Sequence, residues 1–392
     1  MIVFRRMFLA LTSMTLLGFG SHCLQLETNP ASNLAALISA MDGGPQSFLL
    51  FPYEADASGQ SNGMIRATAD GQSPQLLNLE WVPFPGGPAN NWKAAVNNGV
   101  IYILQDDGED ELWISRDQGE NWEIFEAPAD NEDENLTNVL SCGNAVLVSY
   151  SSISQGEEDA YPAYVSYDNG RNFQRWHAQG SGDVTVQGMD CNQDRVIIAT
   201  TISQSEPIQW APISNLNNGV IADNHTFLYT DYVDVVAGDQ GVIGLFNYNG
   251  ESALGYDTRV PFNIQDNGQF PISFRYDDFG IPGGSAFGDS HYYVTVTDSG
   301  DGVCRVYKFL DGSTPPDDAP FSNVPCSDLS GSPGHMPALA TLNDRILVSY
   351  RTGDGTDGGL AMSVDEGLSY ESLDIDSVWN DDGFIRNIEV LR

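Results

Sequence analysis

Seven short runs of β-branched and aromatic residues recur along the chain, each preceded by a polar or Gly/Asn turn. Their first residues lie 52, 46, 50, 46, 50 and 54 positions apart. This period is close to the roughly 40–50 residues of one four-stranded propeller blade. Short apolar runs bounded by turn residues are typical of buried strands. The runs are Phe48–Phe51, Val100–Leu104, Val146–Tyr150, Val196–Thr200, Val242–Phe246, Tyr292–Val296 and Ile346–Tyr350.

These repeats predict an all-β chain: a seven-bladed β-propeller of four-stranded antiparallel blades over residues 38–392, with six blades as the alternative. Hydrophobic residues make up 41% of the sequence, enough for a sizeable core. Only Asn33–Met41 has a helical pattern, and it reads equally well as a strand. The final run, Asn387–Leu391, is strand-like. Pairing with an N-terminal strand would close the ring and remove a sheet edge.

A second motif, S-x-D-x-G-x-x-aromatic, follows three of the runs and begins 15 to 20 residues after each run starts. This spacing predicts a turn between the third and fourth strands of a blade. Ser and Asp oxygens accept hydrogen bonds from nearby backbone N–H groups, Gly supplies a positive φ, and the aromatic ring packs back into the blade. The motif residues are Ser115, Asp117, Gly119 and Trp122; Ser166, Asp168, Gly170 and Phe173; and Ser363, Asp365, Gly367 and Tyr370.

The three motifs resemble Asp-boxes, also called BNR repeats, which mark the sialidase-like β-propellers. Thr68-Ala-Asp70-Gly71 resembles a degenerate fourth copy. In that family the box is a structural turn at the rim of the blade, away from the central site. The resemblance therefore implies that Asp117, Asp168 and Asp365 are structural and not catalytic. The alternative is that these aspartates bind Ca²⁺.

Five cysteines occur, and their number and places suggest two disulfides. Setting Cys23 aside leaves four, an even number suited to an oxidising compartment. Cys142 and Cys191 precede their strand runs by four and five residues, so a bridge between them would join adjacent blades. Cys304 and Cys326 fall inside one repeat and would clip its outer strands. Four cysteines allow three pairings, and this one is our prediction.

The N-terminus predicts export. Arg5 and Arg6 precede an apolar run over residues 7–19, which small residues follow, as in a signal peptide spanning residues 1–22. Residues 23–37 would form a linker. Cys23 stands where a bacterial lipoprotein carries its lipid, which makes lipidation the alternative to secretion. We expect a bacterial protein in the periplasm, at the cell surface or outside the cell.

The chain is strongly acidic, with 54 Asp and Glu against 16 Lys and Arg and a formal net charge of −38. This balance argues against a nucleic-acid partner, because phosphate binding draws most of its affinity from Lys and Arg. No later segment approaches the roughly 20 apolar residues of a transmembrane helix. We expect a monomer that binds a protein or a carbohydrate.

Catalytic signatures of the resembled family do not match. Sialidase-like enzymes carry three arginines, a Tyr nucleophile assisted by Glu, and an Asp acid/base. The only Arg-x-Pro here is Arg259-Val260-Pro261, in the fifth repeat instead of the first. Arg351, directly after a strand run, is a candidate ligand residue for one end of the channel. No His or Cys spacing indicates zinc, so we predict no metal or cofactor, Ca²⁺ alone being left open.

The sequence thus favours a non-catalytic binding, assembly or scaffold role. The alternative is a glycoside hydrolase, sialidase-like or otherwise, acting on extracellular carbohydrate. Glycoside hydrolysis needs only two carboxylates at the right separation, and 54 acidic residues do not single out a pair.

Overall fold

The structure is a computed structural model that divides the chain into two compact units, Met1–Pro45 and Gln46–Arg392. It describes residues within the second unit. The predicted export signal (1–22), Cys23, the linker (23–37) and Asn33–Met41 lie outside them. The described residues are 47–54, 63–69, 74–85, 92–105, 111–126, 136–150, 163–176, 184–192, 195–202, 208–213, 231–248, 251–257, 272–275, 281–297, 303–312, 321–326, 333–342, 345–352, 357–379 and 383–391.

The described residues form seven antiparallel sheets, numbered here in chain order, and no α-helix lies among them. Sheet 1 holds β28 (Gly383–Leu391), β1 (Ser47–Glu54), β2 (Gly63–Ala69) and β3 (Leu76–Pro83). Sheet 2 holds β4 (Trp92–Asn97), β5 (Val100–Gln105), β6 (Glu111–Ser115) and β7 (Glu123–Glu126). Sheet 3 holds β8 (Leu136–Cys142), β9 (Ala145–Tyr150), β10 (Ala163–Ser166) and β11 (Gln174–Trp176). Sheet 4 holds β12 (Val184–Cys191), β13 (Arg195–Ile202) and β14 (Ile208–Pro212).

The other three sheets continue this pattern. Sheet 5 holds β15 (Asp231–Ala237), β16 (Val242–Tyr248), β17 (Glu251–Asp257) and β18 (Ile272–Arg275). Sheet 6 holds β19 (Ile281–Gly288), β20 (His291–Thr297), β21 (Cys304–Leu310) and β22 (Phe321–Val324). Sheet 7 begins with β23 (Pro333–His335) and β24 (Leu339–Leu342), which both pair with β25 (Arg345–Thr352), and continues with β26 (Gly358–Ser363) and β27 (Glu371–Leu373).

Each of the seven runs seen in the sequence lies in the second strand of a sheet: β1, β5, β9, β13, β16, β20 and β25. Such a strand has a partner on both sides and neighbouring sheets over its faces, which explains its nearly continuous apolar composition. The buried clusters lie between consecutive sheets. In one, Leu49 and Met64 of sheet 1 pack with Ile101 and Ile103 of sheet 2. The core is thus a series of layers between sheets.

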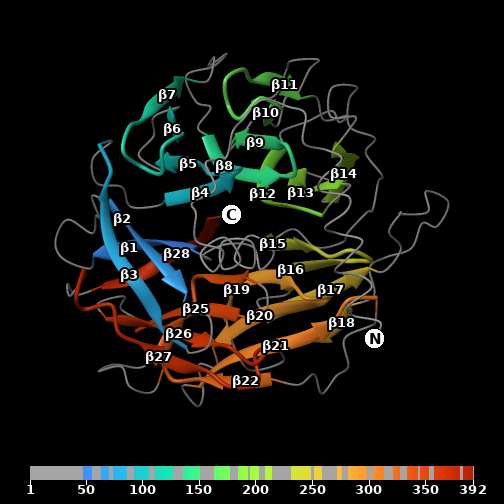
Figure 1. The fold of residues 1–392 in the computed structure, drawn as a ribbon. Coiled ribbons are helices and arrows are strands. Elements are labelled where there is room, and N and C mark those ends of the chain that lie inside the picture. Colours follow the sequence, from blue (N-terminus) through green and yellow to red (C-terminus); the bar gives the residue numbers. More distant parts are fainter. Residues whose placement is uncertain are drawn as a thin grey trace, which may run out of the picture. The chain divides into compact units, whose positions relative to one another are not determined.

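The first strands of the sheets contact one another in a cycle. The contacts run from β4 to β8, β12, β15, β19, β24 and β28, and from β28 back to β4. Figure 1 shows these strands around the middle of the described part, with β7, β22 and β27 at its periphery. The chain therefore has an all-β, propeller-like arrangement of sheets.

The cycle depends on pairing between the two ends of the described chain. β28 lies antiparallel to β1, with Ser47 opposite Leu391 and Glu54 opposite Gly383. The register shifts between Phe51 and Pro52, where proline has no N–H to donate to the ladder. The predicted pairing of the last strand with an N-terminal strand is confirmed.

Both disulfides join the cysteines that the sequence pairs. Cys142 and Cys191, at the ends of β8 and β12, link the first strands of sheets 3 and 4. Cys304 and Cys326 link β21 to the residues that follow β22 within sheet 6. One bridge therefore holds two sheets together, and the other holds the outer part of a single sheet.

The three S-x-D-x-G turns join the third and fourth strands of sheets 2, 3 and 7 and share one hydrogen-bond pattern. In the second copy, Ser166 Oγ donates to Asp168 Oδ1 (2.9 Å) and accepts from Gly170 N–H (2.9 Å). Asn172 donates its backbone N–H and its side-chain amide to the two oxygens of Asp168. The hydrogen bond from the Asn172 side-chain amide is the largest of the effects that lower the pKa of Asp168 to about 2. The same bonds recur at Asp117, and at Asp365 the Ser369 hydroxyl donates in place of the Asn amide.

Each turn also contacts the preceding sheet through a basic side chain. Arg66 of β2 donates to Gln118 Oε1 (2.9 Å), Arg116 after β6 donates to the carbonyl of Asn169, and Lys308 of β21 donates to the carbonyl of Glu366 (3.0 Å). The three acceptors, Gln118, Asn169 and Glu366, precede the turn glycine and have positive φ. The turns are thus part of the packing between sheets.

We predict that Gly170→Ala destabilises the protein more than Gly99→Ala. Both glycines have φ near +75°, a left-handed conformation that costs any other residue about 1–2 kcal/mol. A Cβ at Gly170 would lie 2.8 Å from Tyr102 Cε1, whereas one at Gly99 would meet nothing within 4 Å. The clash should add about 1–3 kcal/mol, measured by urea unfolding. Equal losses in the two variants would contradict this packing.

We predict that loss of the Cys142–Cys191 bridge costs more stability than loss of the other. The bridged cysteines are 49 and 22 residues apart in sequence. The chain-entropy relation gives about 4 kcal/mol for the longer loop and about 3 kcal/mol for the shorter one. Urea unfolding of the two double Cys→Ala variants measures the difference. A smaller loss for the 142/191 variant would contradict its role in joining two sheets.

Candidate functional site

A cavity of roughly 1130 Å³ lies where the first strands of the seven sheets meet. Its wall combines residues of β4, β8, β12, β15, β19, β24 and β28 with the hairpin turns that follow several of them. Every sheet therefore contributes to this one site, from positions about one repeat apart in the sequence.

Side-chain bonds between neighbouring hairpins hold this wall. Asn97 Nδ2 donates to the carbonyls of Gly143 (3.1 Å) and Ala145 (3.2 Å), from sheet 2 to sheet 3. Asn192 Nδ2 donates to the carbonyl of Gly238 (2.9 Å), from sheet 4 to sheet 5. These bonds join neighbouring sheets near the hairpins that follow their first strands.

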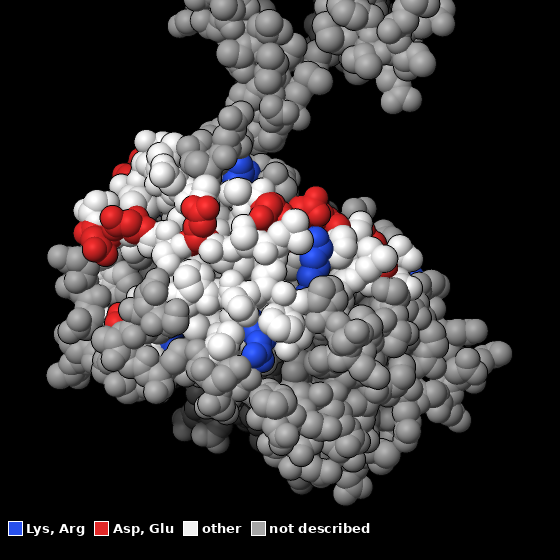
Figure 2. Space-filling model, turned by 90° about the horizontal axis from the view of Figure 1, so that it is seen from below, with Lys and Arg blue, Asp and Glu red and all other residues white. Residues whose placement is uncertain are grey.

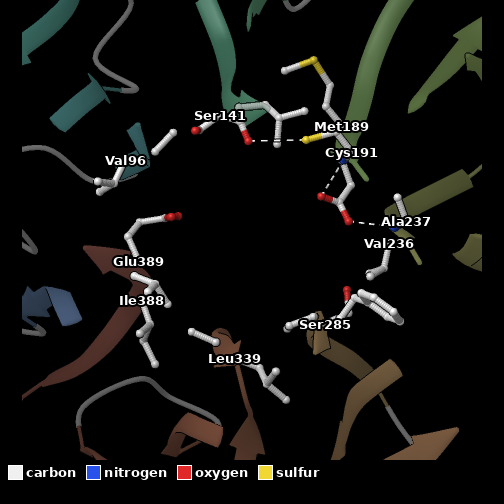
Figure 3. A pocket seen from close by; sticks show the side chains of 18 of the residues that line it. Val96, Ser141, Met189, Cys191, Val236, Ala237, Ser285, Leu339, Ile388 and Glu389 are labelled. Carbon is white, nitrogen blue, oxygen red and sulfur yellow. Dashed lines mark hydrogen bonds between the residues drawn. The ribbon is translucent and has the colours of Figure 1, made fainter. Parts of the chain in front are cut away.

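Several apolar residues also line the cavity. Figure 3 labels Val96, Met189, Val236, Leu339 and Ile388 around it. They come from five different sheets. Val236, Leu339 and Ile388 are almost fully buried, because they pack in the clusters between sheets. They therefore offer a ligand little apolar surface.

Asp190 is held rigidly at the junction of sheets 4 and 5. Its Oδ1 accepts from the N–H of Cys191 (2.7 Å), and its Oδ2 accepts from the N–H of Ala237 in β15 (2.7 Å). Figure 3 shows these bonds along the wall of the cavity. Asp190 thus joins two sheets and places a carboxylate beside the cavity.

Glu389 differs because its carboxyl group points from β28 into the open space (Figure 3). Asn387 Nδ2 donates to its Oε1 over 3.4 Å. Burial raises the pKa of Glu389 to about 8; the Asn387 bond and Lys93 act in the opposite direction, and Asp190 adds to the rise. At neutral pH a carboxyl group with this pKa is mostly protonated.

The sequence analysis did not identify Glu389 or Asp190. Glu389 lies in the predicted closing strand, where it is an acidic residue in an otherwise largely apolar run, and Asp190 directly precedes a predicted disulfide cysteine. In a sequence with 54 acidic residues, neither position by itself singled out its residue as part of a cavity wall.

The predicted site residues lie elsewhere. None of the twelve motif residues of the three turns lines the cavity. Arg351 does not line it either: its guanidinium lies 4.9 Å above the ring of Phe384, between β25 and β28. Arg351 belongs to the second strand of its sheet, against which β28 packs, and its role as a ligand residue stays a prediction.

Other expectations concern arginines, metals and membranes. The described cavity wall includes no Arg or Tyr, and Arg259-Val260-Pro261 falls outside the described residues. Within the ranges given above, no three or more His, Cys, Asp or Glu side chains are grouped so that they could hold a metal. In the same ranges, no helix is long and apolar enough to cross a membrane.

We predict that Glu389→Gln is more stable than the wild type at pH 9 and loses this advantage by pH 5. Between about pH 4.5 and 8 the folded wild type keeps a proton that the unfolded chain releases, so its stability falls as the pH rises. The advantage should be at least about 1 kcal/mol at pH 9, since one pKa unit corresponds to 1.36 kcal/mol.

Glu371→Gln, on the exposed outer strand β27, is the matched control for a change of one charge. Urea unfolding at both pH values measures the difference. If the free energies of unfolding of Glu389→Gln and the wild type differ by the same amount at both pH values, Glu389 does not have a raised pKa in the folded protein.

Comparison with known proteins shows the fold alone. No protein-family model matches the sequence, and no curated protein sequence matches it. A protein from Lactobacillus plantarum superposes with a TM-score of 0.55 at 13% identity, covering 89% of this chain and 100% of that one. A quinonprotein alcohol dehydrogenase-like protein from Bacteroides thetaiotaomicron superposes with a TM-score of 0.51 at 13% identity, covering 86% of this chain and 77% of that one.

YCF48 from Cyanidioschyzon merolae gives a TM-score of 0.45 at 12% identity, covering 78% of this chain and 92% of that one, which is too weak a likeness to carry an argument. The solved structures similar to this chain are β-propeller-like. They agree with the arrangement of its sheets, and the chain is an all-β protein with a propeller-like fold.

Proposed function

We propose that this chain is an exported seven-bladed β-propeller that works as a binding module, with its ligand in the central cavity. The observation that carries the proposal is the cavity itself, about 1130 Å³ in volume and bounded by the first strands of all seven sheets. Ligand sites are commonly concave and provided with a few placed polar groups. The concave cavity with Asp190 and Glu389 on its wall matches this description.

The seven sheets in the cycle of contacts support seven blades over six. The two disulfides suit an oxidising compartment outside the cytoplasm. The three S-x-D-x-G turns act as structural Asp-boxes in this proposal. Their aspartates are occupied by hydrogen bonds within the turn, which supports a structural role over Ca²⁺ binding.

A glycoside hydrolase is the second candidate. It is favoured by two carboxyl groups on one cavity wall, of which Glu389 is protonated at neutral pH and could act as a general acid. Against a sialidase-like enzyme stands the described wall, which lacks the arginines and the tyrosine that such a site requires.

We predict that the mature protein hydrolyses no member of a panel of chromogenic glycosides, sialosides included, with or without Ca²⁺. Turnover that Glu389→Gln abolishes would replace the binding proposal with a hydrolase.

Binding itself is tested with a thermal-shift screen of a defined small-molecule and peptide library. Ser141 lies on the cavity wall, so Ser141→Trp should abolish the stabilisation by each true ligand. Ser372→Trp, on exposed strand β27, is the matched control. Ligands that stabilise both variants equally, or a library without any ligand, would contradict a binding role for the cavity.

A further inference from the structure

The two disulfides differ in how far solvent reaches them. Cys304 and Cys326 are buried in the cluster that includes residues of sheets 6 and 7, and neither is among the described residues that line the cavity. Cys142 is also fully buried. Its partner Cys191, however, is partly exposed and lies on the cavity wall. Of the four bridged cysteines, Cys191 is therefore the one that a molecule in the cavity can approach.

The Cys191 sulfur lies at the edge of the open space. Its Sγ is 3.4 Å from the carbonyl oxygen of Ser141, and Figure 3 shows both groups on the cavity wall. Cys142 packs behind it with Leu147 and Val186, in the apolar cluster between sheets 3 and 4. A molecule in the cavity would therefore meet this bridge from the Cys191 side.

Thiol–disulfide exchange needs such access, because a thiolate must reach one sulfur of the bridge. Attack on Cys191 Sγ forms a mixed disulfide while the bond to Cys142 breaks, and the electron pair leaves on Cys142 Sγ, which takes up a proton. A second thiolate then attacks the outer sulfur of the mixed disulfide and releases Cys191, which is also protonated. Overall, two thiols are oxidised to one disulfide, and the protein bridge is reduced to two thiols.

Reduction at this place changes the cavity wall. The bridge joins the ends of β8 and β12, the first strands of sheets 3 and 4. Asp190, next to Cys191, accepts hydrogen bonds from the N–H groups of Cys191 and Ala237 and so depends on the position of that strand end. Since local opening costs less free energy than global unfolding, loss of the bridge should loosen this part of the wall first.

We propose that the Cys142–Cys191 bridge is a redox switch of the cavity wall. A low-molecular-weight thiol enters the cavity and attacks Cys191, while the enclosed Cys304–Cys326 bridge stays oxidised. Accessible disulfides are the labile ones, and enclosed ones resist reduction. The inference goes beyond the proposed binding role and does not require the cavity to hold a ligand.

The surrounding charge determines which thiol tests the proposal best. The Asp190 carboxylate lies beside the bridge. Outside the cavity, acidic side chains form a band on the side of the molecule drawn in Figure 2, with isolated basic ones between them. Anionic thiols are repelled by charge of this sign, so the probe is the uncharged 2-mercaptoethanol.

The test follows the order in which the two bridges are reduced. Free thiols, including any at Cys23, are first blocked with N-ethylmaleimide. The protein is then treated with 2-mercaptoethanol at pH 8, and new thiols are labelled with deuterated N-ethylmaleimide and located by mass spectrometry. We expect the Cys142–Cys191 bridge to be reduced at least tenfold faster than the Cys304–Cys326 bridge. Equal rates, or faster reduction of the second bridge, would overturn the proposal.

Ser141→Trp tests the route through the cavity, because its side chain would fill the space beside the Cys191 sulfur. It should slow reduction of the Cys142–Cys191 bridge at least tenfold and leave the other bridge unchanged. Ser372→Trp, on exposed strand β27, is the matched control and should behave like the wild type. Unchanged reduction of the cavity bridge in folded Ser141→Trp would contradict attack from the cavity.

The size of the thiol gives a second test that needs no variant. A thiol attached to a long polyethylene glycol chain is too large to enter the cavity. Once each rate is divided by the rate for the urea-unfolded chain, this thiol should reduce the Cys142–Cys191 bridge at least tenfold more slowly than 2-mercaptoethanol. Equal normalised rates would overturn the proposed route.

Hydrogen exchange measured by NMR tests the effect on the wall. After reduction, the N–H groups of Cys191 and Ala237 should exchange at least tenfold faster. The N–H of Gly284, which donates to the carbonyl of Met336 (2.9 Å) elsewhere in the ring, is the control and should keep its rate. Unchanged exchange at Cys191 and Ala237 in the reduced protein would show that the bridge is no switch.

Discussion

Pairing of β28 with β1 is the interaction on which the rest of the structure depends. It covers the edge of the first sheet and completes the cycle of contacts around the cavity. It also brings Glu389 to the cavity, because that residue belongs to the closing strand. The central site is therefore complete only when residues from the two ends of the described chain are paired.

Basic residues are few in this acidic chain, 16 in all, and some of them lie between sheets. Among the described residues, three connect a sheet to the turn of the next one: Arg66, Arg116 and Lys308. Each binds the residue before the turn glycine. Charge repulsion opposes compaction in a chain of net charge −38, so cations placed between sheets offset it where the sheets meet. The repeated turn thus serves both the hairpin and the packing of neighbouring sheets.

Much of the fold could be predicted from the sequence because it follows from local and periodic signals. Runs such as Val100–Leu104 are apolar throughout since sheets cover both faces of the second strand. Ser166, Asp168 and Gly170 predict their turn because its hydrogen bonds join these residues within five positions of the sequence. The cysteine pairs follow from equivalent places in neighbouring repeats.

The cavity could not be predicted in the same way. Whether Glu389 faces a neighbouring sheet or open space is decided by ring closure, a contact between residues more than 300 positions apart. Arg351 is not part of the described cavity wall for a related reason: the wall is formed by first strands, and β25 is a second strand. The sequence shows the repeated strands, whereas the cavity forms only where the first strands of the seven sheets come together.

The raised pKa of Glu389 is the most distinctive chemical property of the cavity wall. The most direct measurement is an NMR titration of protein labelled with ¹³C at the glutamate carboxyl carbons, with the Glu389 signal assigned by its loss in Glu389→Gln. The structure predicts a pKa of about 8 for Glu389. A pKa of about 4.3, the ordinary glutamate value, would contradict the account, because it would mean that Glu389 is solvated and that the cavity does not enclose it.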